Sequence, residues 1–483
     1  MKRFKFGAAL CLVASLAACG GGGSGGGNTA VQVPPTGGTP TPTPPTSNAC
    51  SLSARQSWAL AQMNEWYLFP ETLPTNLNPA NYSTVDDYID ALTATARAQG
   101  RDRFFTHLAS IQEENAFFSS GASAGFGIRL GYDTSQNRVF VIETFENTPA
   151  LTAGLDRSAE ILAIGTSTAN LQNVSAIMAS QGPAGVVNAL GPSTVGTTRV
   201  LRVNDASGTR NITLSKAEYD IVPVSTRYGA KIITDGARKV GYLNLRTFIS
   251  TADQGLRSAF AQFRSEGVTE VIIDLRYNGG GLVSIAELFG DLLGRNRFTS
   301  DVFSFTTFRA SKAQFNESRN FDPQAQSIAP TKIAFIGTGG TASASELVIN
   351  AMIPYLNANA ALVGTNTFGK PVGQIALDRP ECDDRLRVVA FRTENADHQG
   401  DYYGGLGDVI QASCQAPDDI SRPLGDAQEA SVAAALDFLA GRPCTAIAGG
   451  TQTAQSLRSA STDKQLLIPE RPTTAQREVP GTF

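Results

Sequence analysis

Residues 337–350, with the sequence GTGGTASASELVIN, place several hydroxyl side chains in a glycine-rich turn directly before an apolar run. The preceding stretch, TKIAFIG, is typical of a buried strand, and SELVINAM is typical of a helix with one apolar face. At such a helix start, free backbone N–H groups and the helix dipole favour developing negative charge. Ser343 or Ser345 is therefore a candidate nucleophile beside an oxyanion site. The alternative is a plain serine cap with Glu346 in the first helical turn, and this stretch alone favours the cap.

A serine nucleophile needs a base, and the chain contains only two histidines, His107 and His398. Neither lies in a context that resembles a catalytic triad, so we interpret both as structural. Lys370 lies between Gly369 and Pro371 in mostly uncharged surroundings. To act as a base near pH 7, a lysine must lower its pKa by roughly 3 from about 10.4, which corresponds to about 4 to 5 kcal/mol. Full burial can supply such a change, although the segment alone favours a surface lysine in a turn.

A third stretch, DLRYNGGGLVSIAELF, joins an apolar strand that ends at Asp274 to a helical segment. Its connection at residues 278–281 is rich in glycine, and glycine lets backbone amides approach a ligand closely. The alternative for this stretch is an ordinary strand-to-helix connection, which glycine-rich turns often form.

Together and in this order, the three stretches resemble the carboxyl-terminal processing, or tail-specific, serine proteases. They are similar to the NxGG loop, the SASASE motif and the GKxxxQ motif of that family. The resemblance implies that Ser343 is the nucleophile, that Lys370 is the general base and that Gln374 orients the lysine. It also implies that the backbone N–H groups of Gly280 and Ala344 bind the oxyanion.

Residues 122–216 resemble the PDZ domain that these proteases carry between a helical region and the catalytic core. Its carboxylate-binding loop, whose amides would receive a peptide's C-terminus while the peptide adds as a strand, would be Gly125, Phe126, Gly127 and Ile128. TPALTAGL, VGTTRVLRV and GYLNLRTF also resemble segments of the family, and the similarity covers roughly residues 60–440. The family's usual Gly-Asp turn is replaced by DRSAE at residues 156–160, and this departure concerns ligand affinity and gating rather than chemistry.

Two smaller departures lie inside the catalytic motifs. Thr341 stands where the first serine of SASASE usually lies, and Pro371 replaces the common glycine after the lysine. The stretch 382–414 is also more polar than is usual for the family. None of these changes removes a catalytic group.

The elements that must position these residues follow from length, composition and periodicity. A chain of 483 residues predicts two to four domains. With 42% hydrophobic and 17% charged residues it has ample material for a core, and its net charge of -4 gives no sign of nucleic-acid binding. Residues 50–121 show helical periodicity, 122–222 contain short strand-like stretches, and 223–444 alternate strands with helices. Such alternation predicts a largely parallel sheet covered by helices.

We therefore predict a multidomain α/β protein. A helical N-terminal domain (50–121) and a PDZ-like domain (122–222) precede a catalytic domain (223–444), for which the resemblance implies a crotonase-like α/β core. Residues 445–483 are expected to form a weakly ordered tail in which LLIPE, residues 466–470, is the only stretch that docks.

The N-terminus predicts export. A basic start and a short apolar run, MKRFKFGAALCLVASLAA, form a signal peptide over residues 1–18. It ends in LAAC, which resembles a bacterial lipobox, so Cys19 is expected to carry lipid; a plain signal peptide is the alternative. Residues 19–49 form a Gly- and Pro-rich linker that suits a membrane tether. The expected location is the cell envelope. Gly20 after the cysteine resembles an outer-membrane sorting signal, so we expect the folded body to face the periplasm.

Four cysteines follow the lipobox: Cys50, Cys382, Cys414 and Cys444. In an oxidising compartment an even number predicts two disulfides, although spacing does not fix their connectivity. We favour Cys382 with Cys414 and Cys50 with Cys444. No spacing suggests a metal site, and we expect neither a metal nor a cofactor.

The resemblance implies an exported, lipid-anchored serine endopeptidase whose substrates are polypeptides with free C-termini. A catalytically silent, PDZ-bearing scaffold lipoprotein is the alternative from another class, and intact Ser343, Lys370 and Gln374 argue against it. A crotonase-type acyl-transfer enzyme is a third reading, but a PDZ domain and secretion suit polypeptides better than coenzyme A esters. A helper protein, common in the family, leaves no trace in the sequence, and neither does an oligomeric state.

Overall fold

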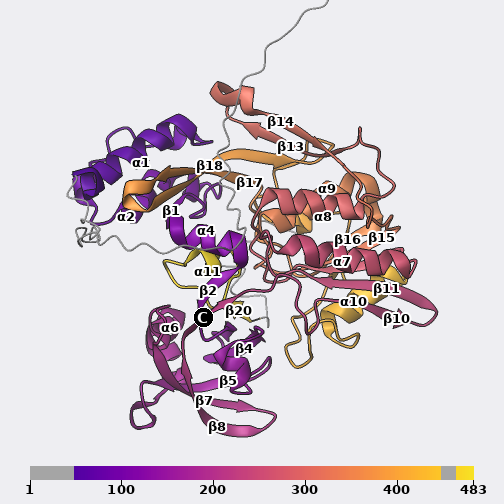
Figure 1. Ribbon diagram of the computed structural model, residues 1–483, viewed down its shortest axis with the longest axis horizontal. Coiled ribbons are helices and arrows are strands. Elements are labelled where there is room, and N and C mark those ends of the chain that lie inside the picture. Colours follow the sequence, from indigo (N-terminus) through magenta and orange to yellow (C-terminus); the bar gives the residue numbers. More distant parts are fainter. Residues whose placement is uncertain (1–47, 448–463) are drawn as a thin grey trace, which may run out of the picture. The chain divides into compact units, whose positions relative to one another are not determined.

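The computed structural model describes residues 48–447 and 464–483. The predicted signal peptide, Cys19 and the linker up to residue 47 lie outside the described residues. The chain divides into Met1–Thr46 and Ser47–Phe483, and every helix and strand below belongs to the second unit (Figure 1). Within the described ranges, no helix combines the length and the apolar character needed to cross a membrane.

A six-stranded sheet forms the core of residues 223–444. Its strand order is β10-β11-β12-β15-β16-β19, in which β11 to β19 pair in parallel and β10 is antiparallel. The parallel arrangement predicted from the alternation of elements is therefore confirmed. The strands are β10 (Ala230–Asp235), β11 (Arg238–Asn244), β12 (Glu270–Asp274), β15 (Lys332–Gly337), β16 (Ala360–Gly364) and β19 (Ala412–Gln415).

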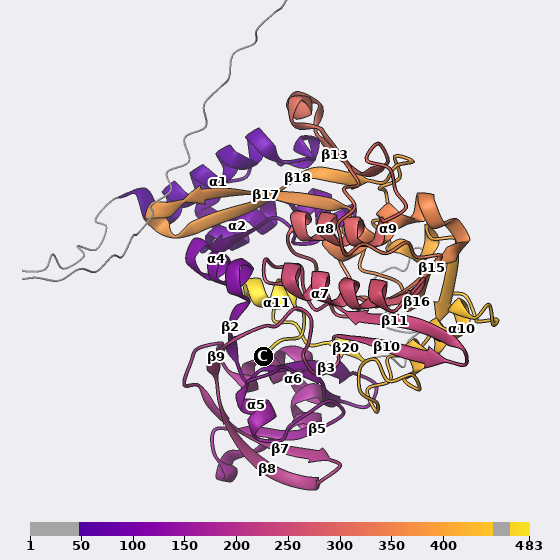
Figure 2. The ribbon, with the colours of Figure 1, turned by 45° about the vertical axis from the view of Figure 1, so that its right-hand side comes forward.

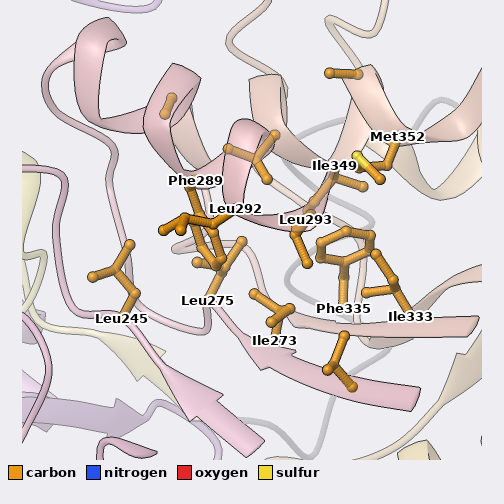
Figure 3. Close-up of a cluster of buried hydrophobic side chains, with 14 of the residues drawn as sticks. Leu245, Ile273, Leu275, Phe289, Leu292, Leu293, Ile333, Phe335, Ile349 and Met352 are labelled. Atoms are coloured by element: carbon orange, nitrogen blue, oxygen red, sulfur yellow. The ribbon is translucent and has the colours of Figure 1, made fainter. Parts of the chain in front are cut away.

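Helices cover both faces of this sheet because successive strand residues point to opposite sides. Ile273 and Phe335 belong to a buried cluster that also includes residues of three helices, α7 (Ala252–Ser265), α8 (Val283–Leu293) and α9 (Ala344–Leu356). Their neighbours Ile272 and Ala334 belong to a second cluster with α10 (Ala430–Leu439). Figure 3 shows the first cluster, with side chains of α8 and α9 packed on β12 and β15.

Residues 122–222, which we call the β-rich region, form all but one strand of a seven-stranded sheet with its own core; β20 of the tail supplies the remaining strand. Its order is β20-β3-β4-β5-β7-β8, with β6 paired to β5, while β2 and β9 form a separate pair. The buried cluster includes Phe126, Ile128 and Leu130. The elements are β2 (Ala122–Gly125), β3 (Ile128–Asp133), β4 (Arg138–Thr144), α5 (Pro149–Thr152), β5 (Glu160–Gly165), β6 (Gln172–Asn173), α6 (Val174–Leu190), β7 (Thr198–Asp205), β8 (Gly208–Ser215), β9 (Ala217–Asp220) and β20 (Gln465–Leu466).

The N-terminal helices are α1 (Leu52–Trp66), α2 (Val85–Leu92), α3 (Ala94–Ala98) and α4 (Ile111–Ser120). The side chains of Ser51, Thr84 and Ser110 cap α1, α2 and α4 by accepting backbone N–H bonds. Helices α1 to α3 share a buried core with the hairpin of β17 (Val372–Arg379) and β18 (Asp384–Glu394), which lies beside α1 and α2 in Figures 1 and 2.

A second sheet, separate from the six-stranded one, contains this hairpin. Its order is β1-β18-β13-β14, with β17 paired to β18; the remaining strands are β1 (His107–Ser110), β13 (Val302–Phe308) and β14 (Glu317–Asn320). Because β1 pairs with β18, the helical segment is joined by backbone hydrogen bonds to a strand nearly three hundred residues later.

Two disulfides form, but our preferred pairing was wrong. Cys50 bonds Cys382 and Cys414 bonds Cys444, with Cα–Cα separations of 5.5 and 5.4 Å. Cys382 lies at the tip of the β17–β18 hairpin, next to the start of α1, whereas Cys414 lies on β19 in the other sheet. Different sheets separate the two cysteines that we had paired.

The expectation that residues 466–470 alone would dock in the tail was also wrong. Leu467 is buried, but residues 474–483 dock as well, through the short helix α11 (Thr474–Glu478) and a buried end. Both views show α11 beside α4, next to the β-rich region (Figures 1 and 2). The docking carries consequences for the site below.

Candidate active site

Ser343 occupies the tight turn between β15 and α9. Its φ of 55° and ψ of -116° place a non-glycine residue in a strained region of backbone space. Neighbouring contacts hold this geometry: the Ala342 N–H donates to the Asn278 carbonyl oxygen at 3.0 Å, and the Leu347 N–H donates to the Ser343 carbonyl oxygen at 2.8 Å. Ser343 keeps part of its surface exposed.

Ser345, the other candidate, is fully buried, and its hydroxyl donates to the Asn278 carbonyl oxygen at 3.1 Å. Its side chain thus supports the turn from within. Of the two serines, the geometry leaves Ser343 open to a substrate.

Glu346 joins the serine turn to the lysine loop. This buried carboxylate accepts the N–H groups of Ser343 at 3.0 Å and of Lys370 at 2.7 Å through the same oxygen, Oε2. Its other oxygen accepts from the Gly369 N–H and the Thr367 hydroxyl, both at 2.6 Å. Burial raises the pKa of Glu346, while these hydrogen bonds oppose the rise. The sequence showed Glu346 only as a first-turn acid; its second set of partners depends on tertiary structure.

Lys370 points its ammonium group at Gln374, with Nζ donating to Oε1 at 3.0 Å. Gln374 is held in turn, because its Nε2 donates to the carbonyl oxygen of Phe105. Nζ also lies 5.1 Å from the centroid of the Phe105 ring. Desolvation lowers the pKa of Lys370, and the nearby negative charge of Glu478 opposes that decrease. In the described chain, no hydrogen bond joins Nζ to Ser343.

The glycine loop lies against the serine turn. A Cβ at Gly280, whose φ is 122°, would approach the Ser343 Cβ to 2.8 Å and the Ala344 nitrogen to 3.2 Å. Only glycine therefore fits here without a shift. Ala344 begins α9, and the first amides of a helix have no intrahelical acceptor.

The amides of this loop have separate partners. The Gly280 N–H donates to Asn278 Oδ1 at 2.9 Å, so it is engaged within the loop. The Gly279 N–H donates to the carbonyl oxygen of Glu478, also at 2.9 Å. A backbone carbonyl of the tail thus lies on the amide next to the predicted oxyanion donor, a contact that sequence analysis did not anticipate.

A cavity of about 1150 Å³ adjoins these groups. Its lining includes Gly279, Ala342 and Lys370, together with Arg477 and Glu478 of the tail. The cleft next to the serine turn is therefore walled in part by the chain's own last residues.

The two histidines lie in different places. His398 stacks on Phe305 with ring centroids 4.2 Å apart. His107 lines the cavity, and its Nδ1 lies 2.7 Å from the carbonyl oxygen of Phe105. Burial lowers the pKa of His107 well below its usual value, and the cations Arg477 and Lys370 add to the effect. The lowered pKa favours the neutral form of His107, whose ring forms part of the cavity wall.

The predicted carboxylate-binding loop lies at the other end of the tail. Gly125 ends β2 and Ile128 begins β3. The N–H groups of Gly127 and Ile128 donate to the carbonyl oxygen of Phe483 at 3.0 and 3.2 Å.

The altered turn at 156–160 connects the β-rich region to the core. The Arg157 guanidinium donates to Asp418 Oδ1 at 3.1 Å and to the Tyr277 hydroxyl at 3.3 Å. It also donates to three carbonyl oxygens, those of Ile142, Asp419 and Arg422. We call these contacts of Arg157 the Arg157 clasp. Because Tyr277 directly precedes the glycine loop, the clasp lies beside the candidate site.

Comparisons with known proteins agree with this arrangement. Residues 239–400 match the model of "Peptidase family S41", and residues 55–106 match the "Peptidase S41 N-terminal domain". The two matched segments contain the serine turn, the lysine loop and Phe105. They support peptidase family S41, whose members are serine peptidases, and they do not favour a silent scaffold.

The curated relatives of this chain include carboxyl-terminal processing proteases. The chain is 26% identical to carboxyl-terminal-processing peptidase 3 of Arabidopsis thaliana, over 63% of this chain and 57% of that protein. It is 23% identical to a carboxyl-terminal-processing protease of Synechocystis, over 80% and 86%, and 26% identical to a carboxy-terminal processing protease of Bacillus subtilis, over 66% and 62%. The chain thus spans less than two thirds of the Arabidopsis and Bacillus relatives.

Among solved structures, the chain resembles a Bacteroides fragilis protein assigned to the S41 proteases. The TM-score is 0.61 at 23% identity, over 80% of this chain and 97% of that one. At this identity the likeness establishes the mixed α/β fold alone.

Proposed function

We propose that this chain is a serine endopeptidase in which Ser343 is the nucleophile, Lys370 is the general base and Gln374 positions the lysine. One observation carries the proposal: the buried carboxylate of Glu346 bonds the backbone N–H groups of both Ser343 and Lys370. The two motifs are thereby held against each other around one oxygen atom. The S41 matches supply independent support for the reaction class.

In the reaction, neutral Lys370 accepts the Ser343 proton as Oγ attacks a peptide carbonyl carbon. The oxyanion is stabilised by the N–H groups of Ala344 and Gly280, and the Gly280 N–H must exchange its bond to Asn278 Oδ1 for the oxyanion. Lys370 then returns the proton to the leaving amine, and water hydrolyses the acyl-enzyme. Nζ must approach Oγ when substrate binds; catalytic hydrogen bonds are often long in free enzymes and tighten in the complex.

The lysine's surroundings support its role as a base. Desolvation lowers its pKa, so a larger fraction is neutral at a given pH than for a free lysine. The Phe105 ring and carbonyl fix Gln374 and shield the ammonium.

The β-rich region serves, in this proposal, as a PDZ-like domain that binds the C-termini of polypeptide substrates at residues 125–128. Lipidation of Cys19 would anchor the body to a bacterial membrane in the cell envelope, facing the periplasm. The contacts of Gly127 and Ile128 with a backbone carbonyl support the first point; the LAAC sequence supports the second.

The test compares cleavage of an unstructured peptide with apolar C-terminal residues by the unchanged chain, Ser343→Ala and Ser284→Ala. Ser284 is exposed on α8 and serves as the matched control. Loss of cleavage in Ser343→Ala alone supports the proposal. Cleavage that persists in Ser343→Ala contradicts it.

A further inference from the structure

The last three residues form an added strand on β3. The Phe483 N–H donates to the Ile128 carbonyl oxygen at 2.8 Å, and the Leu130 N–H donates to the Gly481 carbonyl oxygen at 2.8 Å. Thr482 pairs with Arg129 in antiparallel register. This is the geometry by which an extended peptide adds to an exposed sheet edge.

Phe483 itself fills the end of that groove. Its carbonyl oxygen accepts the two amides of residues 127 and 128, and its side chain is 3% exposed within the cluster that contains Phe126. A Cβ at Gly125 would lie 2.6 Å from the Phe483 carbonyl carbon, so the close approach requires glycine at that position. The loop predicted to receive a peptide end is therefore occupied by residue 483.

The same segment then crosses the candidate active site. The Glu478 carbonyl oxygen accepts a hydrogen bond from the Gly279 N–H at 2.9 Å, and the Pro480 carbonyl oxygen accepts one from Arg129 Nη1 at 2.7 Å. The Gln476 side chain donates to the Thr482 carbonyl oxygen at 2.8 Å and fixes the path of the segment. The negative charge of Glu478 interacts favourably with the cations Lys370, Arg387 and Arg477 and unfavourably with the carboxylate of Glu114.

We propose that residues 473–483, the tail segment, are an internal ligand that occupies the peptide groove and the adjoining cleft together. An incoming polypeptide that ends in a large apolar residue must displace the tail segment before it can be cleaved. This inference rests on the proposed function, because it names the substrate class and the regulation of that site.

The sequence of the tail segment also indicates which peptide side chains the groove accepts. Position 483 places a phenylalanine side chain in the apolar core. Two residues earlier, Gly481 has a φ of 88°, and a Cβ there would lie 3.0 Å from the Leu130 carbonyl oxygen. Ligands with a small residue at that position and an aromatic end are therefore the matching class.

Competition sets the size of the effect. When a binding-competent state is only fractionally populated, the apparent affinity falls by that fraction, so an internal ligand bound about 90% of the time weakens an external peptide about tenfold. At about 99% occupancy the loss is about a hundredfold.

Binding is measured by fluorescence anisotropy with a labelled peptide REVPGTF, in chains that carry Ser343→Ala so that nothing is cleaved. Phe483→Asp releases the tail segment, while Phe298→Asp is the matched control, because Phe298 is 75% exposed and does not line the cavity beside the serine turn. We expect the peptide to bind Phe483→Asp at least tenfold more tightly than Phe298→Asp. The peptide REVPGTD should bind both weakly. Equal affinities of REVPGTF for the two chains, or of the two peptides for Phe483→Asp, would overturn the proposal.

A second variant covers the case in which Phe483→Asp fails to fold, as monitored by circular dichroism. Gln476→Ala removes a bond of the tail segment and leaves the peptide groove unchanged, so it should also tighten peptide binding. Hydrogen exchange shows whether the tail segment has been released in a folded Gln476→Ala chain. If it has been released and the peptide binds no more tightly than before, the proposal that the peptide must displace the tail segment is contradicted.

Turnover separates this inference from the proposed function. With Ser343 intact, Phe483→Asp should cleave a Phe-ending peptide at lower KM than Phe298→Asp. If neither chain cleaves but the binding difference persists, the internal ligand stands and the peptidase proposal fails. If both cleave with equal KM, the internal ligand fails and the peptidase stands.

Discussion

Replacing Gly280 with alanine tests whether the glycine loop lies against the nucleophile. The new Cβ would lie 2.8 Å from the Ser343 Cβ, whereas ordinary contacts begin at 3.4 Å, so the loop and the serine turn must separate. Since a misplacement of 1 Å can cost about 10²-fold in rate, we expect kcat/KM to fall about 10- to 100-fold. The φ of 122° adds strain of about 1 to 3 kcal/mol, which lowers the unfolding free energy.

Gly267→Ala is the matched control. Gly267 also has a left-handed backbone, with φ of 66°, but no atom lies within 4 Å of a Cβ placed there. It should lose about 1 to 2 kcal/mol of stability from the backbone alone and keep its kcat/KM. Peptide cleavage and thermal unfolding are measured side by side. A folded Gly280→Ala chain with the control's kcat/KM would refute the contact between loop and nucleophile.

Three further outcomes are expected. First, kcat/KM should fall as pH drops through the pKa of Lys370, because a protonated amine cannot accept the serine proton; burial lowers that pKa from 10.5, so a pH series should place the acid limb below pH 10.5. Second, Glu478→Gln should move this limb to lower pH, because the Glu478 charge raises the lysine pKa; an unmoved limb would show that the two groups do not interact. Third, the double variant Cys50→Ser with Cys382→Ser should lose about 2 to 4 kcal/mol of unfolding free energy, and urea titrations should show reductant lowering the stability of the unchanged chain more than that of the variant.

Periodicity predicted the elements of the core because their signals are local. The alternation of strands and helices after residue 223 gives a largely parallel sheet once each apolar strand must be covered on both faces. The serine turn was also predicted from the sequence, because a glycine-rich stretch between a buried strand and an apolar helix has few conformations other than a tight turn. Apart from the family resemblance, only burial separates Ser343 from Ser345, and two serines two residues apart at a helix start do not reveal their burial in the sequence.

Other features depended on contacts between distant segments. The disulfide partners are set by the β17–β18 hairpin meeting the start of α1, which no spacing encodes. The second set of bonds to Glu346 comes from a loop more than twenty residues away. Residues 474–483 carry too short an apolar pattern to predict docking, because only a few of their side chains enter the core and their backbone partners are sheet-edge groups far away in the sequence.

The Arg157 clasp has a thermodynamic consequence. Its guanidinium belongs to the β-rich region, while Asp418 and Tyr277 belong to the core, and all three side chains are largely removed from water. Separating the two regions would break the hydrogen bonds from Arg157 to Asp418, to Tyr277 and to two core carbonyl oxygens, while Asp418 would keep its bond to Arg276. Hydrogen bonds that involve a charged group typically contribute about 1.5 to 3 kcal/mol each. The β-rich region therefore cannot melt independently at small cost, and heat should unfold it together with the sheet that carries the serine turn as one cooperative transition.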